Sequence, residues 1–574
     1  MPQALRPLRR VRWPVALLLA LIVLVGLVLR LRHNDYGLPF SYVADERNHF
    51  TVHAVRMFGG DANPGYFKNP SAFTYLLHVL LRLPLGGVGP LPDLSGGDPA
   101  RLFSADPTPF FQTGRSLAAL LCMAGVLAVF FAGRRLWGAR EGLVGAAALS
   151  FAFLPVAYSR LALTDVGTFL PVVLAVFGAV RAYETGARRF YVLAGAASGL
   201  AIGFKYTTGL ILLVVLAAAV LRARRRRSEW RSTLASVGVA AAACAATFFV
   251  TTPFFFADLG FSLEQLRGQS RIISDLPKYG QSQTTGLLFY LDTLGWGFGW
   301  AACLAALAGG VFALRRDRAR GVLLLLFPVV FFVYMADQSR YFARYLIAIY
   351  PVLALLCGVG LVRAVDLLVA RPAVRAVVLA VATAAVLAQP LAAGIRTSEL
   401  LGREHTLQSA RNFLIRSYPR GTPIEFPQGA TRTDRVVPVD YVLGAGRRRQ
   451  FPKDSGGALK NLKASFVDGY RRRGFCLVMT TSIERGKAEA ARSRNVLAYY
   501  KRLEQEADVV FAADPYGAGE GPVPFHHDLS YNYYPAAYDR PGPAVTVYRL
   551  RDCRPGTTTG RPAERRLAST SRNR

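Results

Sequence analysis

The sequence predicts a polytopic α-helical membrane protein of about eleven transmembrane helices, with a C-terminal extracytoplasmic α/β domain. The chain of 574 residues is 52% hydrophobic and has a mean hydropathy of +0.28, which few soluble chains sustain over such a length. Its basic residues fall mostly between apolar runs and do not follow one polar surface. The formal charge of +33 therefore indicates membrane topology and not a nucleic-acid partner.

The first apolar run follows a basic segment, MPQALRPLRRVRW, and no small-residue cleavage site comes after it. This pattern predicts a signal anchor that the mature protein retains. Further runs of spanning length follow along the chain. They occupy residues 115–133, 142–157, 166–182, 190–204, 207–221, 233–251, 286–314, 321–335, 342–362 and 374–395.

Alternate connections between these runs are basic, as the positive-inside rule requires of cytoplasmic loops. They are RRLWGAR, RAYETGARR, RARRRRSEWR, RRDRAR and the segment 363–375. The opposite connections have fewer such clusters, which predicts a multi-pass plasma-membrane protein with a cytoplasmic N-terminus. The run RARRRR is interpreted as an anchor that touches anionic membrane lipids.

An odd number of spans places the polar C-terminal part on the extracytoplasmic side. We expect a transmembrane domain at 1–395, which includes a first extracytoplasmic loop at about 30–112. An α/β domain is expected at 396–552, and 553–574 is a basic tail with almost no apolar content, which predicts disorder.

Short segments in this outer domain have the patterns of helices and strands. The expected helices are RNFLIRSYP and KAEAARSRNVLAYYKRLEQ, and the expected strands are PIEF, FCLVMT, DVVFAA and AVTVYRL. Cys476 and Cys553 also lie in the polar C-terminal part, but the sequence does not decide whether they pair.

Two adjacent acids, Asp45 and Glu46, stand in the stretch YVADERNHF of the first outer loop. A carboxylate beside apolar protein is partly desolvated, which raises its basicity and suits a general base for a hydroxyl acceptor. The alternative is an acid pair at the N-terminus of a helix on a solvated loop. The local residues leave both interpretations open.

Three cations on the predicted outer side lie between apolar runs, where the positive-inside rule does not expect them. They are Lys205 in GFKYTT, and Arg340 and Arg344 in QSRYFARY. Fixed cations stabilise the charge that grows on a departing phosphate. The alternative is that each side chain reaches out to the lipid headgroups.

A possible metal-ligand spacing occurs in the same loop. Asp45, His49 and His53 recur every four residues, so on a continuous helix they would share one face. The alternative is that His53 packs against Met57. The sequence thus requires no cofactor and leaves a divalent metal open.

The acid pair DE, the step AVRMFGG and the stretch PGYFKNPSAFTYL together resemble polyprenyl-phosphate-sugar-dependent glycosyltransferases of the C fold. The resemblance is to the branch of protein O-mannosyltransferases and aminoarabinose transferases. Three later segments agree with it in order and sidedness: SRLALTDVGTF, SRYFARYLIAIYPVLALL and HTLQSARNFLIRSYPRGTPIEF.

The resemblance implies roles for individual residues. Asp45 matches the aspartate that deprotonates the acceptor, and Asp165 matches a second outer acid that positions the acceptor or a metal. Lys68 matches a lysine that contacts the donor phosphate, although this chain has KNP where the family has KPP. Glu46 completes the acid pair without a separate role.

The predicted function is an integral membrane glycosyltransferase of the cell envelope. It would transfer a sugar from a polyprenyl-phosphate donor to an extracytoplasmic hydroxyl of a protein, lipid or glycan, with inversion. The rival interpretations are a lipid or polysaccharide transporter and a non-catalytic envelope-assembly subunit. Most spans consist of Ala, Leu, Val and Gly, with ionisable residues at their outer ends, which favours a site at the membrane face over a transport path.

Overall fold

The computed structural model describes residues 13–83, 97–281, 284–419, 422–425, 461–526 and 534–554. The chain divides into two compact units. A helical unit comprises Met1–Arg403 and His526–Ala536, and a smaller unit comprises Glu404–Phe525 and Ala537–Arg574.

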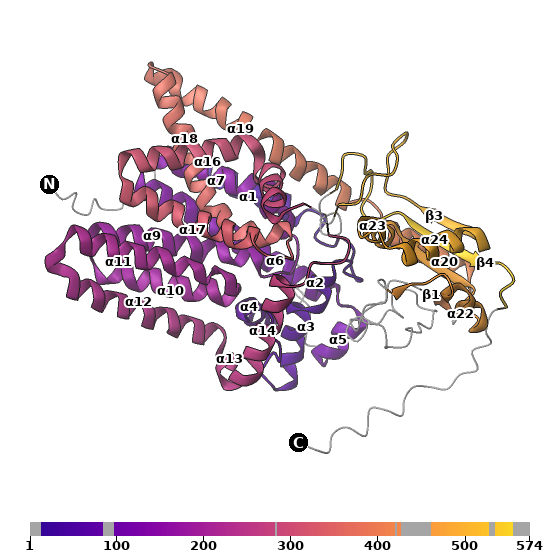
Figure 1. The fold of residues 1–574 in the computed structure, drawn as a ribbon. Coiled ribbons are helices and arrows are strands. Elements are labelled where there is room, and N and C mark those ends of the chain that lie inside the picture. Colours follow the sequence, from indigo (N-terminus) through magenta and orange to yellow (C-terminus); the bar gives the residue numbers. More distant parts are fainter. Residues whose placement is uncertain are drawn as a thin grey trace. The chain divides into compact units, whose positions relative to one another are not determined.

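The helical unit has long apolar helices joined by short helical turns (Figure 1). Its elements are α1 (Trp13–Leu31), α2 (Ala44–Asn48), α3 (Phe50–Arg56), η1 (Met57–Gly59), α4 (Ala72–Arg82), α5 (Pro99–Ala105), α6 (Thr108–Leu136), α7 (Ala139–Phe151), α8 (Phe153–Tyr158), η2 (Asp165–Thr168), α9 (Phe169–Thr185), α10 (Arg188–Phe204), η3 (Tyr206–Ile211), α11 (Leu212–Arg225), η4 (Arg227–Glu229), α12 (Trp230–Thr251), α13 (Pro253–Ala257), α14 (Leu259–Ser274), α15 (Gly286–Leu294), η5 (Gly295–Gly299), α16 (Trp300–Arg316), α17 (Arg318–Ala336), η6 (Ala343–Ile349), α18 (Tyr350–Leu368) and α19 (Pro372–Leu401).

Nine helical segments of the described residues are long and apolar enough to cross a membrane. The prediction of a polytopic α-helical membrane protein is therefore confirmed. All the predicted apolar runs are helical, but 142–157 and 190–204 form shorter helices than the nine. The first of these runs is divided between α7 and α8, where the backbone at Ala152 leaves the helical region (φ −58°, ψ 132°). The nine segments are Trp13–Leu31, Thr108–Leu136, Asp165–Thr185, Tyr206–Arg225, Arg227–Thr251, Gly286–Arg316, Arg318–Ala336, Ala343–Leu368 and Pro372–Ser417.

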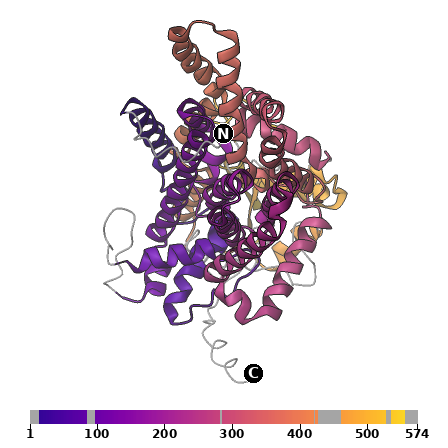
Figure 2. The same ribbon diagram turned by 90° about the vertical axis from the view of Figure 1, so that its left-hand side faces the viewer.

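Small residues let the long helices approach each other closely. A Cβ atom added to Gly195 or Gly199 of α10 would lie 2.0 Å from the carbonyl oxygen of Ala240 or 2.2 Å from that of Cys244, both on α12. The same device brings transmembrane helices into van der Waals contact where lipid offers no hydrophobic driving force. Figure 2, which turns the view by 90°, shows the helices of this unit gathered into a bundle.

The first loop folds into the short helices α2 to α5 between α1 and α6. α4 is amphipathic, and Phe73, Leu77 and Leu81 on its apolar face are buried. The segment before α4 is fixed by Phe67, which is fully buried and contacts the rings of Phe255 and Phe261 on α13 and α14. These contacts hold the loop against the bundle.

The smaller unit contains a four-stranded mixed sheet in the order β1-β2-β4-β3. β1 (Ile424–Glu425) is parallel to β2 (Leu477–Thr481), and β4 (Val545–Leu550) is antiparallel to both β2 and β3 (Ala507–Ala513). The four predicted strands are therefore confirmed. Its helices are α20 (Thr406–Ser417), α22 (Phe466–Arg472), α23 (Ser482–Ala490) and α24 (Arg494–Glu506).

The helix predicted over KAEAARSRNVLAYYKRLEQ is divided in the structure. α23 ends at Ala490, and α24 begins at Arg494. Between them Arg492 has a positive φ of 49°, which no helical residue adopts. The predicted single helix was therefore wrong in its length. The predicted tail lies outside the described residues from residue 555 onward.

Cys476 and Cys553, whose pairing the sequence left open, form a disulfide across a sequence separation of 77. The bond joins the residue that immediately precedes β2 to the segment after β4. Replacing both residues with Ser is expected to lower the free energy of unfolding of the smaller unit by about 2–5 kcal/mol, because the unfolded chain gains freedom. Thermal unfolding of the full-length protein in lipid, with and without a reductant, measures this loss. Equal melting of the wild type and the double variant would contradict it.

Candidate functional site

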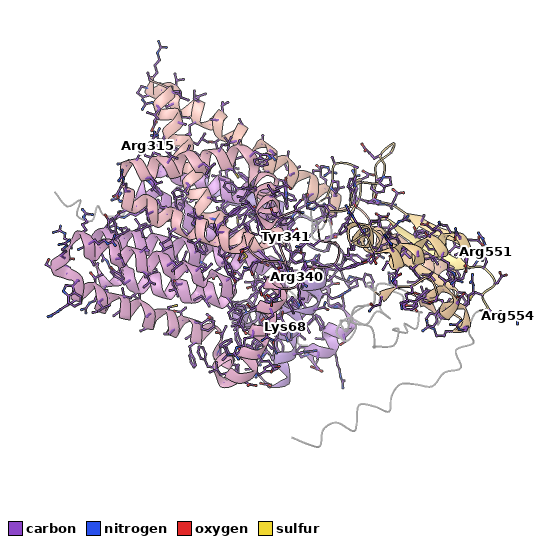
Figure 3. All side chains as sticks on the ribbon, in the orientation of Figure 1. Lys68, Arg315, Arg340, Tyr341, Arg551 and Arg554 are labelled. Carbon is purple, nitrogen blue, oxygen red and sulfur yellow. A yellow bond between two sulfur atoms is a disulfide. The ribbon has the colours of Figure 1, made fainter. Side chains whose placement is uncertain are left out.

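The helical unit contains a partly open cavity of about 470 Å³, a volume in the range of ligand-binding sites. Its lining comes from the first loop, from the turns that begin η2 and η3, from α14 with its following loop, and from the turn between α17 and η6. Figure 3 labels Lys68 and Arg340 in this part of the unit and Arg315 at the far end of the bundle. Apart from tyrosines, the ionisable lining residues are Asp45, His49, Lys68, Asp165, Lys205, Lys278, Arg340 and Arg344.

Asp45 lies in the first turn of α2 and faces the cavity. Its carboxylate accepts an ion-pair contact from the Arg344 guanidinium at 2.8 Å. Burial would raise the pKa of Asp45, but the neighbouring Arg344, with a smaller contribution from Lys278, outweighs burial and holds this pKa below its ordinary value. Asp45 is therefore ionised at neutral pH.

Asp165 and Lys205 form a second ion pair, with 2.6 Å between Nζ and Oδ1. Asp165 is the first residue of η2, and Lys205 lies in extended backbone between α10 and η3. The Lys205 ammonium also donates to the backbone carbonyl of Arg344 at 3.2 Å. The two ion pairs are thus joined through one segment of the chain.

The predicted phosphate contacts Lys68, Lys205, Arg340 and Arg344 all line this cavity. Lys278 also lines it and was missed by the sequence analysis. Its ammonium lies 4.6 Å from the centroid of the Phe342 ring. Lys278 lies in the polar stretch SDLPKYG. Nothing in that stretch distinguishes this lysine from a lysine that is exposed to solvent.

Glu46, predicted together with Asp45 as part of a catalytic acid pair, does not line the cavity, and this part of the prediction is corrected. Its carboxylate is fully buried and binds the Arg115 guanidinium with two contacts of 2.7 Å. It also accepts from the Ser41 hydroxyl at 2.8 Å and from the backbone N–H of Ala162 at 2.9 Å. Successive side chains of a helix point about 100° apart, so the neighbour of Asp45 faces the interior. Glu46 is a positioning residue for α2.

The predicted metal-ligand arrangement of Asp45, His49 and His53 is wrong, because the helix is broken. α2 ends at Asn48, and His49 has φ −112° and ψ −105°. His49 and His53 both pack on the Tyr66 ring, with centroids 5.2 and 4.7 Å apart. Burial lowers the pKa of His53 to about 4, so His53 is neutral at pH 7.

The acids of the cavity do not fit a divalent cation either. Asp45 and Asp165 each already contact a cationic side chain, at 2.8 and 2.6 Å. Within the part of the chain that the structure describes, no group of three or more His, Cys, Asp and Glu side chains is placed to hold a metal ion. A divalent ion would have to displace Arg344 and Lys205 and then find further ligands.

Residues 111–251 match the sequence model of the dolichyl-phosphate-mannose-protein mannosyltransferase family. This segment runs from α6 through α12 and contains Asp165 and Lys205. The fold of the whole chain is similar to that of the archaeal oligosaccharyltransferase AglB from Archaeoglobus fulgidus, solved with an inhibitory peptide and a dolichol-phosphate. The TM-score is 0.53 at 13% identity over 88% of this chain and 73% of AglB. The chain is a glycosyltransferase of the C fold.

Two further solved structures are similar to this glycosyltransferase. The apo form of the Archaeoglobus fulgidus oligosaccharyltransferase matches with a TM-score of 0.53 at 13% identity, over 92% of this chain and 75% of the other. ArnT from Cupriavidus metallidurans in the apo state matches with a TM-score of 0.49 at 17% identity, over 81% and 92%. Among curated protein sequences none matches.

The predicted family resemblance, the fold class and the prediction of an enzyme are thereby confirmed for this glycosyltransferase. The matched segment includes Asp165 and Lys205 but not Asp45, Lys68, Arg340 or Arg344. A match of this kind assigns no residue roles, so the individual roles of all these residues stay predictions.

Proposed function

We propose that this glycosyltransferase transfers a sugar from a polyprenyl-phosphate donor to an extracytoplasmic hydroxyl, with inversion at the sugar carbon. The observation that carries the proposal is that the ionised carboxylate of Asp45 shares one cavity with five cationic side chains. They are Lys68, Lys205, Lys278, Arg340 and Arg344. The dolichol-phosphate in the AglB structure supports a lipid-phosphate donor.

The reaction uses these groups in one displacement. The acceptor oxygen attacks the anomeric carbon while the Asp45 carboxylate takes the hydroxyl proton. The bond from this carbon to the phosphate oxygen breaks, and its electron pair stays on the phosphate. The cations stabilise the additional negative charge on this leaving group more strongly in the transition state than in the bound donor. Attack from the side opposite the phosphate inverts the anomeric centre.

The ion pair between Asp45 and Arg344 determines the order in which donor binding and proton transfer take place. While Arg344 contacts Asp45 at 2.8 Å, the carboxylate is a weak base because its pKa is held low. A bound donor phosphate competes for the same guanidinium and so makes Asp45 more basic. The donor therefore binds before the acceptor loses its proton.

The topology we propose places the cavity on the extracytoplasmic side of the plasma membrane. The basic connections, among them 222–227 between α11 and α12, face the cytoplasm together with the N-terminus. The transmembrane domain at 1–395 is then followed by the extracytoplasmic domain at 396–552. The acceptor is a protein, lipid or glycan on that side.

Release of polyprenyl phosphate tests the proposal. The purified full-length protein in lipid is offered a panel of polyprenyl-phosphate sugars, with membrane extract as the acceptor. Release that depends on both donor and extract is the expected result. Folded protein that releases nothing from any donor, or that moves labelled lipid across the bilayer without cleaving it, would favour the transporter and overturn the proposal.

A chelator is expected to leave the transfer rate unchanged, because Asp45 and Asp165 pair with Arg344 and Lys205 and not with a divalent ion. The rate is measured after dialysis against EDTA and again after addition of Mg²⁺ or Mn²⁺. A loss that one of these metals restores would contradict this expectation.

A further inference from the structure

The cavity carries an excess of positive charge. Of the side chains described in its lining, five are Lys or Arg and two are Asp, which leaves an excess of three positive charges. The bound donor is a phosphodiester with one negative charge, and the released polyprenyl phosphate approaches two negative charges at neutral pH. The excess therefore accommodates both the donor and the product.

Both carboxylates of this lining already contact a cationic side chain of the protein. Asp45 contacts Arg344 and Asp165 contacts Lys205, and all four side chains are at least three-quarters buried. The adjacent acid Glu46 is fully buried and is bound by Arg115. A ligand ammonium that took Asp165 would leave the buried Lys205 without its partner, which is costly. An ammonium that took Asp45 would occupy the carboxylate that the acceptor hydroxyl needs for its proton.

The remaining polar groups of the lining suit hydroxyl groups. Asn69, Gln269 and Gln338 offer side-chain amides, which both donate and accept hydrogen bonds. Tyr66, Tyr206 and Tyr345 add aromatic surface to the same cavity. These groups match the hydrogen bonds that an uncharged, hydroxyl-bearing ring makes, without any contribution from a carboxylate.

We propose that the cavity selects a donor whose sugar is uncharged and that it discriminates against an amino sugar. The inference rests on the proposed function and narrows its donor class. A sugar ammonium would add one more positive charge to an unbalanced cavity. At an effective dielectric constant of about 20 and a separation of about 7 Å, this repulsion weakens binding more than tenfold.

Three synthetic polyprenyl-phosphate pentosides that differ at one ring position test the selection. One carries a hydroxyl, one an amine and one a formamide at that position. The amine donor is expected to give at least about tenfold lower kcat/KM for polyprenyl-phosphate release than the hydroxyl donor. The formamide, which restores neutrality, should recover most of the loss. An amine donor as good as the hydroxyl donor, or a formamide as poor as the amine, would overturn the selection by charge.

A matched pair of variants tests whether the positive charge of the cavity causes the discrimination between the two donors. Lys278→Gln removes a cation of the lining and is expected to narrow the ratio between the hydroxyl and amine donors. Arg271→Gln removes an exposed cation of α14 that does not line the cavity, and it should leave the ratio unchanged. A ratio that Lys278→Gln leaves as in the wild type would overturn the charge account.

A binding measurement tests the selection without turnover. The amount of each of the three radiolabelled donors that stays bound to the protein in lipid discs is compared. Absence of release from every donor would overturn the proposed function. If such a protein still bound the hydroxyl donor more tightly than the amine donor, the selection against a charged sugar would remain supported although the proposed transfer reaction had failed. Equal retention of these two donors would overturn the selection as well.

Discussion

Asp45→Asn is expected to lower sugar transfer by about a hundredfold or more, because the amide cannot take the acceptor proton. The substitution keeps the shape of the side chain at the start of α2. The loss should appear in kcat more than in KM for the donor, since the cations that hold the phosphate remain. Polyprenyl-phosphate release by the full-length protein in lipid, measured over a range of donor concentrations, gives both constants.

Asp61→Asn is a matched control for this variant. Asp61 belongs to the same first loop, is exposed and does not line the cavity, so its substitution should leave transfer at the wild-type rate. Transfer by Asp45→Asn at that rate would show that Asp45 is not the base. The pH profile adds a second test. Because the pKa of Asp45 is held below its ordinary value, Asp45 should not limit kcat/KM as the pH falls from 7 to about 5.

The helices could be predicted from sequence because a membrane leaves the backbone few choices. Every polar group of a spanning segment must be satisfied within the segment, so a long apolar run becomes a helix. All the predicted runs are helical for this reason. The break at Ala152 and the turn at Arg492 depend on local backbone geometry, which apolar content does not report.

The cavity was predictable in part, for reasons that differ between residues. Lys205, Arg340 and Arg344 stood out because the positive-inside rule does not expect cations between apolar runs on the outer side. Asp45 and Glu46 looked equivalent, since the partner that separates them, Arg115, lies 69 residues from Glu46 in the sequence. The two histidines looked like metal ligands only on the assumption of a continuous helix, which ends at Asn48.

Arg115→Gln is expected to destabilise the helical unit by about 3–5 kcal/mol, because it leaves a buried carboxylate without its counter-ion. The Arg115 and Glu46 side chains are 2% and 0% exposed. Arg115 also donates to the backbone carbonyls of Asn34 and Tyr36, each at 2.8 Å. Arg115, which belongs to α6, therefore connects this helix to the segment that precedes α2. Thermal unfolding in lipid measures the loss.

The same substitution should also lower transfer, since α2 carries Asp45 next to Glu46. The double variant Arg115→Gln/Glu46→Gln removes both charges, so it should recover part of the stability that the single variant loses. Arg140→Gln breaks a pair with Asp366 in which the arginine is 48% exposed, and its cost should stay below about 1 kcal/mol. If Arg115→Gln unfolds at the same temperature as Arg140→Gln, the buried pair does not hold α2. The alignment of Asp45 with the cations of the cavity would then have to come from the Arg344 contact itself.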